Sequence, residues 1–144
     1  MYKHLALLLL TVVSSLAIAG PSDEKPYKEG PVVTLGYIRV KDGKLNDYLA
    51  YLGGTYRAEM EAQKKAGIIL DWHVYQTIPH SPNDPTLILT VTYPNFAAWD
   101  RTADVDAITA KVEGSLKSSD QGLSDRGSIR QIMGGDYVQE LILK

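Results

Sequence analysis

Four stretches of the chain are rich in β-branched and aromatic residues and are bounded by turn residues, a pattern typical of β-strands. They are residues 32–41, 68–78, 86–93 and 137–143. The proline-rich segment 79–85 separates the second stretch from the third, so these two are expected to form an antiparallel pair. The pattern therefore predicts four strands.

Between the first two strands, apolar positions recur at three- and four-residue steps, which predicts a helix over residues 44–66 that ends at Gly67. Its apolar stripe consists of Leu45, Tyr48, Leu49, Leu52, Tyr56 and Met60. Gly53 and Gly54 interrupt this helix at a cost of about 1 kcal/mol each relative to alanine. We expect close packing on the sheet to account for them, with a local bend as the alternative.

The rest of the chain completes the predicted topology. A second helical region is expected over residues 96–117, and the polar segment 118–127 is expected to be a loop or a short helix. The elements then follow the order strand, helix, strand, strand, helix, strand, which is that of a ferredoxin-like split βαβ sandwich. The predicted fold class is α+β, a βαββαβ sandwich with a four-stranded antiparallel sheet.

The N-terminus has the features of a secretory signal peptide. Lys3 precedes an apolar run over residues 5–13, and a small-residue triplet ends at Ala19. A membrane anchor is the alternative, but the run covers about nine residues, whereas a spanning helix needs roughly twenty. Cleavage after Ala19 is therefore expected.

This cleavage sets the predicted organisation of the chain. Residues 1–19 form the signal peptide, residues 20–31 a flexible leader, and residues 32–144 a single domain large enough to build its own core. The mature protein is expected in the periplasm or outside the cell, with no membrane attachment after cleavage.

Composition removes several classes of function. The net charge is −2 and no basic run occurs, so no nucleic-acid partner is expected. The chain contains no cysteine, which removes disulfides, thiolate nucleophiles, zinc ribbons and iron–sulfur clusters together. The sequence has no Gly-x-Ser-x-Gly elbow and no phosphate-binding glycine loop, and it leaves the cofactor unknown.

Several segments resemble the dimeric α/β-barrel superfamily of ferredoxin-like proteins. They are GYIRVKDGKLNDYLAYL, the paired strands around WHVYQT and LILTVTYPNFAAWD, and the closing YVQELIL, and the likeness covers about residues 31–144. The resemblance implies a homodimer in which two four-stranded sheets face each other and enclose a small cavity. Members include cofactorless oxygenases, haem-handling proteins and isomerases. This chain carries the catalytic motif of none of them and has an insertion-like stretch over residues 102–127.

Alternation along the second strand divides its side chains between the two faces of the sheet. Trp72, Val74 and Ile78 form an apolar face that should meet the helices. The opposite face holds Asp71, His73, Tyr75 and Thr77, joined from other strands by Tyr37, Arg39, Thr90, Thr92 and Glu140. Because buried polar groups need partners, such a face forms a dimer interface, lines a ligand cavity or meets solvent.

His73 is the candidate for proton transfer, because histidine alone has an unperturbed side-chain pKa of about 6.5. Asp71 or Glu140 could fix its tautomer. A structural histidine is the alternative. His80 and His73 together would supply only two nitrogen ligands at a spacing of no standard motif, so no metal is expected. The candidate ligand-binding residues are Tyr37, Arg39, His73, Tyr75, Thr90 and Glu140.

These residues lead to three functional hypotheses. The first is an exported homodimer that binds a small, aromatic molecule between its sheets, next to the candidate residues above. The second is an enzyme of the cofactorless oxygenase or isomerase kind, with His73 as acid or base and Tyr37, Tyr75 or Arg39 polarising a substrate oxygen. The third is a structural or partner-binding domain.

Overall fold

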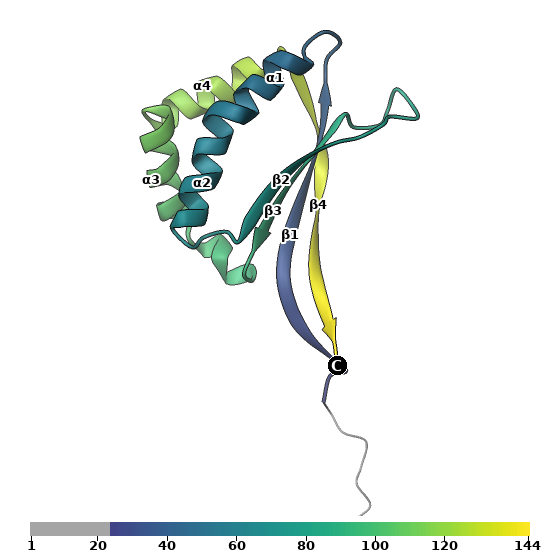
Figure 1. Ribbon diagram of the computed structural model, residues 1–144. Helices are drawn as coiled ribbons and strands as arrows, with labels where there is room; N and C mark the ends of the chain where they lie inside the picture. Colours follow the sequence, from purple (N-terminus) through teal and green to yellow (C-terminus); the bar gives the residue numbers. More distant parts are fainter. Residues whose placement is uncertain (1–23) are drawn as a thin grey trace, which may run out of the picture.

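The computed structural model of the 144-residue chain describes residues 24–144. The predicted signal peptide and the first residues of the predicted leader lie outside the described residues. The described chain forms one antiparallel sheet with helices on one of its faces (Figure 1). This arrangement confirms the predicted α+β class.

The sheet has the strand order of a ferredoxin-like fold. Its strands are β1 (Tyr27–Val40), β2 (Asp71–Gln76), β3 (Leu87–Tyr93) and β4 (Arg130–Leu143). They lie side by side in the order β2-β3-β1-β4, and every neighbouring pair is antiparallel. The predicted antiparallel pairing of the second and third strands is therefore correct, and β2 and β4 form the two edges.

The first helical segment is continuous but changes its winding in the middle. It consists of the α-helix α1 (Leu45–Tyr51), the π-helical turn η1 (Leu52–Tyr56) and the α-helix α2 (Arg57–Lys65). Gly53 and Gly54 lie in the π-turn, and a Cβ on either would meet no atom within 4 Å. The expectation of close packing at these glycines is wrong, because the helix changes its winding here while their Cα atoms face open space.

The second helical region is longer than expected. The 3₁₀-helix η2 (Phe96–Asp100) is followed by α3 (Thr102–Glu113) and α4 (Leu116–Arg126). The polar segment predicted as a loop or short helix thus contributes most of an eleven-residue helix. Ser115 explains its start, because its Oγ accepts a hydrogen bond from the backbone N–H of Ser118 at 3.0 Å.

The core lies between the helices and the sheet in two clusters. One consists of Ile38, Val40, Tyr48, Leu52 and Leu87, and the other of Met60, Ile68 and Ile69. Val74 packs against the first cluster and Trp72 against the second, as the alternation predicts. Ile78 is 85% exposed instead, because β2 ends at Gln76 and the chain leaves the sheet before reaching it.

The strands β1 and β4 extend beyond the rest of the sheet as a two-stranded ribbon (Figure 1). β1 begins at Tyr27, which pairs with Leu143, so the prediction of a flexible leader is wrong for residues 27–31. Gly30 and Pro31 fall where the register between the strands shifts, and a proline is tolerated at such a bulge because its missing N–H is not needed there.

β4 also begins earlier than predicted, at Arg130 rather than Tyr137. The pair Gly134-Gly135 looked like a strand boundary, but it lies inside the strand. The register shifts between Tyr37 and Ile38 of β1, opposite this part of β4, and Gly134 has φ +115°, a conformation that favours glycine. The glycines therefore allow a bulge instead of ending the strand.

Gly135 should be the least replaceable glycine of the sheet. A Cβ added there would overlap the carbonyl oxygen of Leu35, so we expect Gly135→Ala to lower the free energy of unfolding by about 1–3 kcal/mol. Gly53→Ala is the matched control and should raise it by up to about 1 kcal/mol, because alanine is the better helix former and its Cβ meets nothing. Urea unfolding at equal protein concentration measures both; equal destabilisation would contradict the assignment.

Candidate functional site

Among residues 24–144, no helix covers the sheet face that carries the predicted candidate residues (Figure 1). Ile38, Val40 and Leu87 are in the core below the helices, so their strand neighbours point the other way. The register aligns Tyr37, Ile88 and Tyr75 in one row across this face, and Leu35, Thr90 and His73 in the next. We call this surface the open face.

Polar contacts hold several of these side chains in place. The Tyr37 hydroxyl donates a hydrogen bond to Asp136 Oδ2 at 2.9 Å. The ring centroids of His73 and Tyr75 lie 5.7 Å apart. Thr90, in the neighbouring strand β3, is only 9% exposed. All of the six candidate residues except Glu140 belong to the neighbouring strands β1, β3 and β2.

Glu140 does not join this group. β4 and β2 are opposite edges of the sheet, so Glu140 is separated from His73 by three strand spacings, roughly 14 Å. It lies opposite Gly30 in the protruding ribbon, beyond the last residue of β3. The suggestion that Glu140 could fix the tautomer of His73 is therefore wrong, and Asp71 is the carboxylate within reach.

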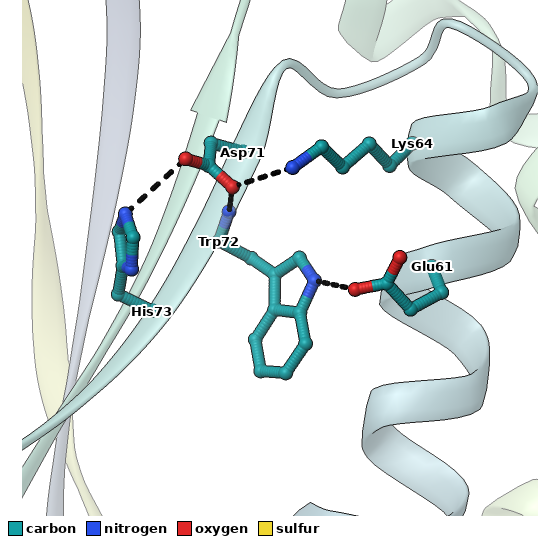
Figure 2. A network of polar contacts seen from close by, with 5 residues as sticks. All are labelled: Glu61, Lys64, Asp71, Trp72 and His73. Atoms are coloured by element: carbon teal, nitrogen blue, oxygen red, sulfur yellow. Dashed lines mark hydrogen bonds and ion pairs between the residues drawn. The ribbon is translucent and has the colours of Figure 1, made fainter.

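Figure 2 shows the network around Asp71 at the β2 edge. Asp71 Oδ2 lies 3.3 Å from His73 Nε2, while Asp71 Oδ1 accepts hydrogen bonds from Lys64 Nζ at 2.9 Å and from the Trp72 backbone N–H at 3.0 Å. The hydrogen bond from Lys64 and then that from Trp72 hold the pKa of Asp71 below its ordinary value. On the other face of the strand, the Trp72 indole N–H donates to Glu61 at 3.0 Å.

A cavity of about 580 Å³ lies on the opposite, helix-covered side of the sheet. Its lining residues are Thr34, Leu35, Gly36, Ile68, Tyr93, Ala98, Trp99, Thr102, Val105, Asp106, Gly134, Gly135 and Tyr137. Gly36 of β1 pairs with Gly135 of β4, and Gly134 precedes Gly135 in the same strand. Since none of these three has a side chain, part of the wall is bare backbone. We call this space the glycine-floored cavity.

Aromatic side chains form another part of its wall. The Trp99 ring centroid lies 6.0 Å from that of Tyr93 and 5.1 Å from that of Tyr137, and Phe96 packs edge-on against Trp99 at 5.1 Å. Burial raises the pKa of the Tyr93 phenol, which is therefore neutral at physiological pH. Among the lining residues only Asp106 has a charged side chain. The cavity suits a flat and mainly apolar molecule.

None of the six predicted ligand-binding residues lines the glycine-floored cavity. Sequence reasoning missed it because its walls come from β1, β4 and η2, which are far apart along the chain. The segment with Phe96 and Trp99 was interpreted only as a helix start, and Gly134-Gly135 only as a boundary. Two adjacent glycines in an otherwise apolar strand can mark a close approach of backbone or ligand, and this was the available indication.

A second cavity of about 510 Å³ lies between the first helical segment and the β2 edge. It is lined by Leu49, Leu52, Gly53, Arg57, Glu61, Trp72, His73 and Val74. His73 is the only predicted site residue that lines either of the two cavities. We call this space the π-turn cavity, because Gly53 belongs to η1.

Two further properties concern residues 24–144. Within this range no cluster of three or more histidine, aspartate or glutamate side chains is placed to bind a metal ion. In the same range, none of the helices has the length and apolar character needed to cross a membrane.

The topology and the single helix layer define a ferredoxin-like α+β protein. The chain is similar to HapK from Hahella chejuensis, with a TM-score of 0.51 and 11% identity over 76% of this chain and 91% of HapK. It is also similar to a dimeric ferredoxin-like protein from an uncultured marine organism, with a TM-score of 0.50 and 9% identity over 81% and 98% of the two chains. No protein-family model and no curated protein matches the chain. At this level of identity the similarities establish the fold alone.

The ion pair between Lys64 and Asp71 should make the stability of the protein depend on pH. Lys64→Met removes the hydrogen bond to Asp71, so the pKa of Asp71 should rise toward about 3.9. A carboxyl ¹³C titration measures this pKa. A lowered carboxyl pKa stabilises the folded state above the unfolded pKa, and this contribution disappears as the pH falls through the folded value. The gap in Tm between the wild type and Lys64→Met should therefore narrow from pH 7 to pH 3.

Lys65→Met is the control for this prediction, because it removes the same charge from the neighbouring position without touching Asp71. An Asp71 pKa that stays low in Lys64→Met, or one that rises equally in Lys65→Met, would show that the hydrogen bond is not its cause.

Proposed function

We propose that this protein binds a small, flat and mainly apolar molecule in the glycine-floored cavity. The observation that carries the proposal is the combination of a backbone floor with aromatic walls: Gly36 and Gly135 on one side, Trp99 and Tyr93 on the other. A planar ring can lie against backbone only where no Cβ intervenes, and aromatic side chains then stack on or meet its edges.

The size and polarity of the cavity support this ligand class. Its volume of about 580 Å³ falls within the range of about 300–1,000 Å³ common for small-molecule sites. The hydroxyls of Thr34 and Thr102 offer hydrogen bonds to one or two polar substituents. Asp106, as the only charged lining side chain, disfavours an anion, so a neutral ligand is proposed.

The location differs from the first sequence hypothesis, which placed the ligand between two sheets. His73 does not line the glycine-floored cavity. Catalysis by His73 on a ligand held there would need the proton to cross the sheet. We therefore propose binding rather than an oxygenase or isomerase reaction.

The proposal includes a homodimer formed through the open face. This face presents Tyr75 and Val138, which are 51% and 48% exposed, beside the ordered pair Tyr37–Asp136. A second copy would cover these apolar side chains, and the Tyr37–Asp136 pair would supply the polar part of the interface. The similar protein from an uncultured marine organism is described as dimeric, which supports the same assembly here.

We also propose that the mature protein is exported after removal of residues 1–19. The support is the sequence pattern at the N-terminus, and the compartment remains the periplasm or the exterior. Gly20 would be the first residue of the mature chain.

Ligand binding can be followed through Trp99. In a Trp72→Phe background, Trp99 is the only tryptophan, and a neutral flat probe such as 1-naphthol should quench its fluorescence saturably. Gly36→Val should weaken this binding at least tenfold, about 1.4 kcal/mol, because its side chain fills the cavity. The nearest atoms to a Cβ at Gly36 are 3.8 Å away, so the sheet should accept the change.

Gly53→Ala is the control, since it enlarges a glycine outside the glycine-floored cavity. Absence of saturable quenching, or equal affinity in the wild type and Gly36→Val, would refute the proposed site.

Native mass spectrometry of the protein purified from its own host should give a dimer whose subunits begin at Gly20. Tyr75→Glu should raise the dimer dissociation constant at least tenfold, because it places two carboxylates in an apolar interface. Ile78→Glu is the matched control, since Ile78 is exposed but lies beyond the end of β2. A wild-type monomer at micromolar concentration, or equal effects of the two variants, would refute the interface, and intact residues 1–19 would refute cleavage.

A further inference from the structure

We infer that the π-turn cavity is a second binding site, selective for a small aromatic carboxylate. The inference rests on three features of this cavity: its apolar wall, the winding of the helix above it, and the charged group that remains available at it. It is independent of the ligand proposed for the glycine-floored cavity.

The first feature is the wall. Leu49 and Leu52 from the helical segment and Val74 from β2 supply aliphatic surface, and the Trp72 indole lies beside them. The volume of about 510 Å³ accommodates a bicyclic aromatic ring. Trp72 is held by its hydrogen bond to Glu61 and by edge-to-face contact with Tyr56, with ring centroids 5.7 Å apart. A fixed ring presents a preformed surface to a ligand.

The second feature is the π-turn itself. π-helical winding is rare, occurs mostly as single turns inside α-helices, and is frequent at functional sites. Its two glycines weaken the helix by about 1 kcal/mol each relative to alanine. Neither is required by packing, because a Cβ at Gly53 or Gly54 would meet nothing within 4 Å. Gly53 lines the cavity, and the missing side chain keeps the space beside the ring-binding wall open.

The third feature is the positive charge of Arg57. Asp71 is paired with Lys64 and His73, and Glu61, which lines the cavity and keeps its negative charge, accepts the Trp72 indole N–H. Arg57 lines the cavity, is exposed, and makes no ion pair within residues 24–144. The guanidinium fork matches a carboxylate in a bidentate geometry, which selects an anion here.

These features define the ligand class. The aromatic part would lie against Leu52, Val74 and the Trp72 ring, and the carboxylate would meet Arg57 at the end of the π-turn. The glycine-floored cavity offers no cation, because its only charged lining residue is Asp106, whereas the π-turn cavity offers Arg57 beside Glu61. The two sites should therefore separate a neutral ring from its carboxylate analogue.

The test uses 1-naphthoate as the probe and the two tryptophans as reporters. The chain has two tryptophans, and Trp72 lines the π-turn cavity whereas Trp99 lines the other. In ¹H–¹⁵N spectra of the wild type, 1-naphthoate should shift the Trp72 indole N–H saturably, at lower concentrations than any shift of Trp99. Arg57→Gln should weaken this response at least tenfold, and Arg57→Lys should keep part of it.

Lys65→Gln is the matched control, because it removes one positive charge from the same helix at a position outside the cavity. The inference is overturned if 1-naphthoate shifts only Trp99, if it shifts neither indole, or if Arg57→Gln and Lys65→Gln weaken binding equally. Because the proposed function is read from Trp99 and a neutral probe, failure at one cavity leaves the result at the other intact.

Discussion

The pairing of β1 with β4 is the interaction on which the rest of the structure depends. β1 is an inner strand that pairs with β3 along one edge and with β4 along the other. The two backbones approach so closely at Leu35 and Gly135 that no Cβ fits on Gly135. The same absence of side chains leaves space below η2 and α3, which becomes the glycine-floored cavity. Assembly of the sheet and formation of the cavity thus have a single cause.

Most of the fold could be predicted from local patterns, because each strand and helix repeats its apolar residues at its own period. Alternation also assigned Trp72 and Val74 to the helix side and His73 and Tyr75 to the other. The ends of the strands were harder to predict, because glycine and proline occur both at strand ends and at bulges inside strands. Gly30-Pro31 and Gly134-Gly135 fell outside the predicted strands, yet both occur at bulges inside long strands.

The sites were predictable only in part. The shared face of Tyr37, Thr90 and His73 follows from period-two alternation, but which strands are neighbours decides whether residues meet. Glu140 therefore fell at the wrong edge, since strand order is a tertiary property. Both cavities lie between the sheet and helical segments, and their shapes depend on how side chains from separate elements pack. Arg57 gave no indication in the sequence, because an exposed arginine on a helix is ordinary until its neighbours are known.

The β1–β4 pairing also constrains the order in which the molecule can fold. Tyr27 and Leu143, which pair at the end of the ribbon, lie near opposite ends of the chain. Contacts of such long sequence separation form late, because the entropy of closing the intervening loop must be overcome first. Until β4 pairs with β1, β1 has a single partner strand, and the floor of the larger cavity does not exist. The chain therefore reaches its binding-competent form only after β4 has joined the sheet.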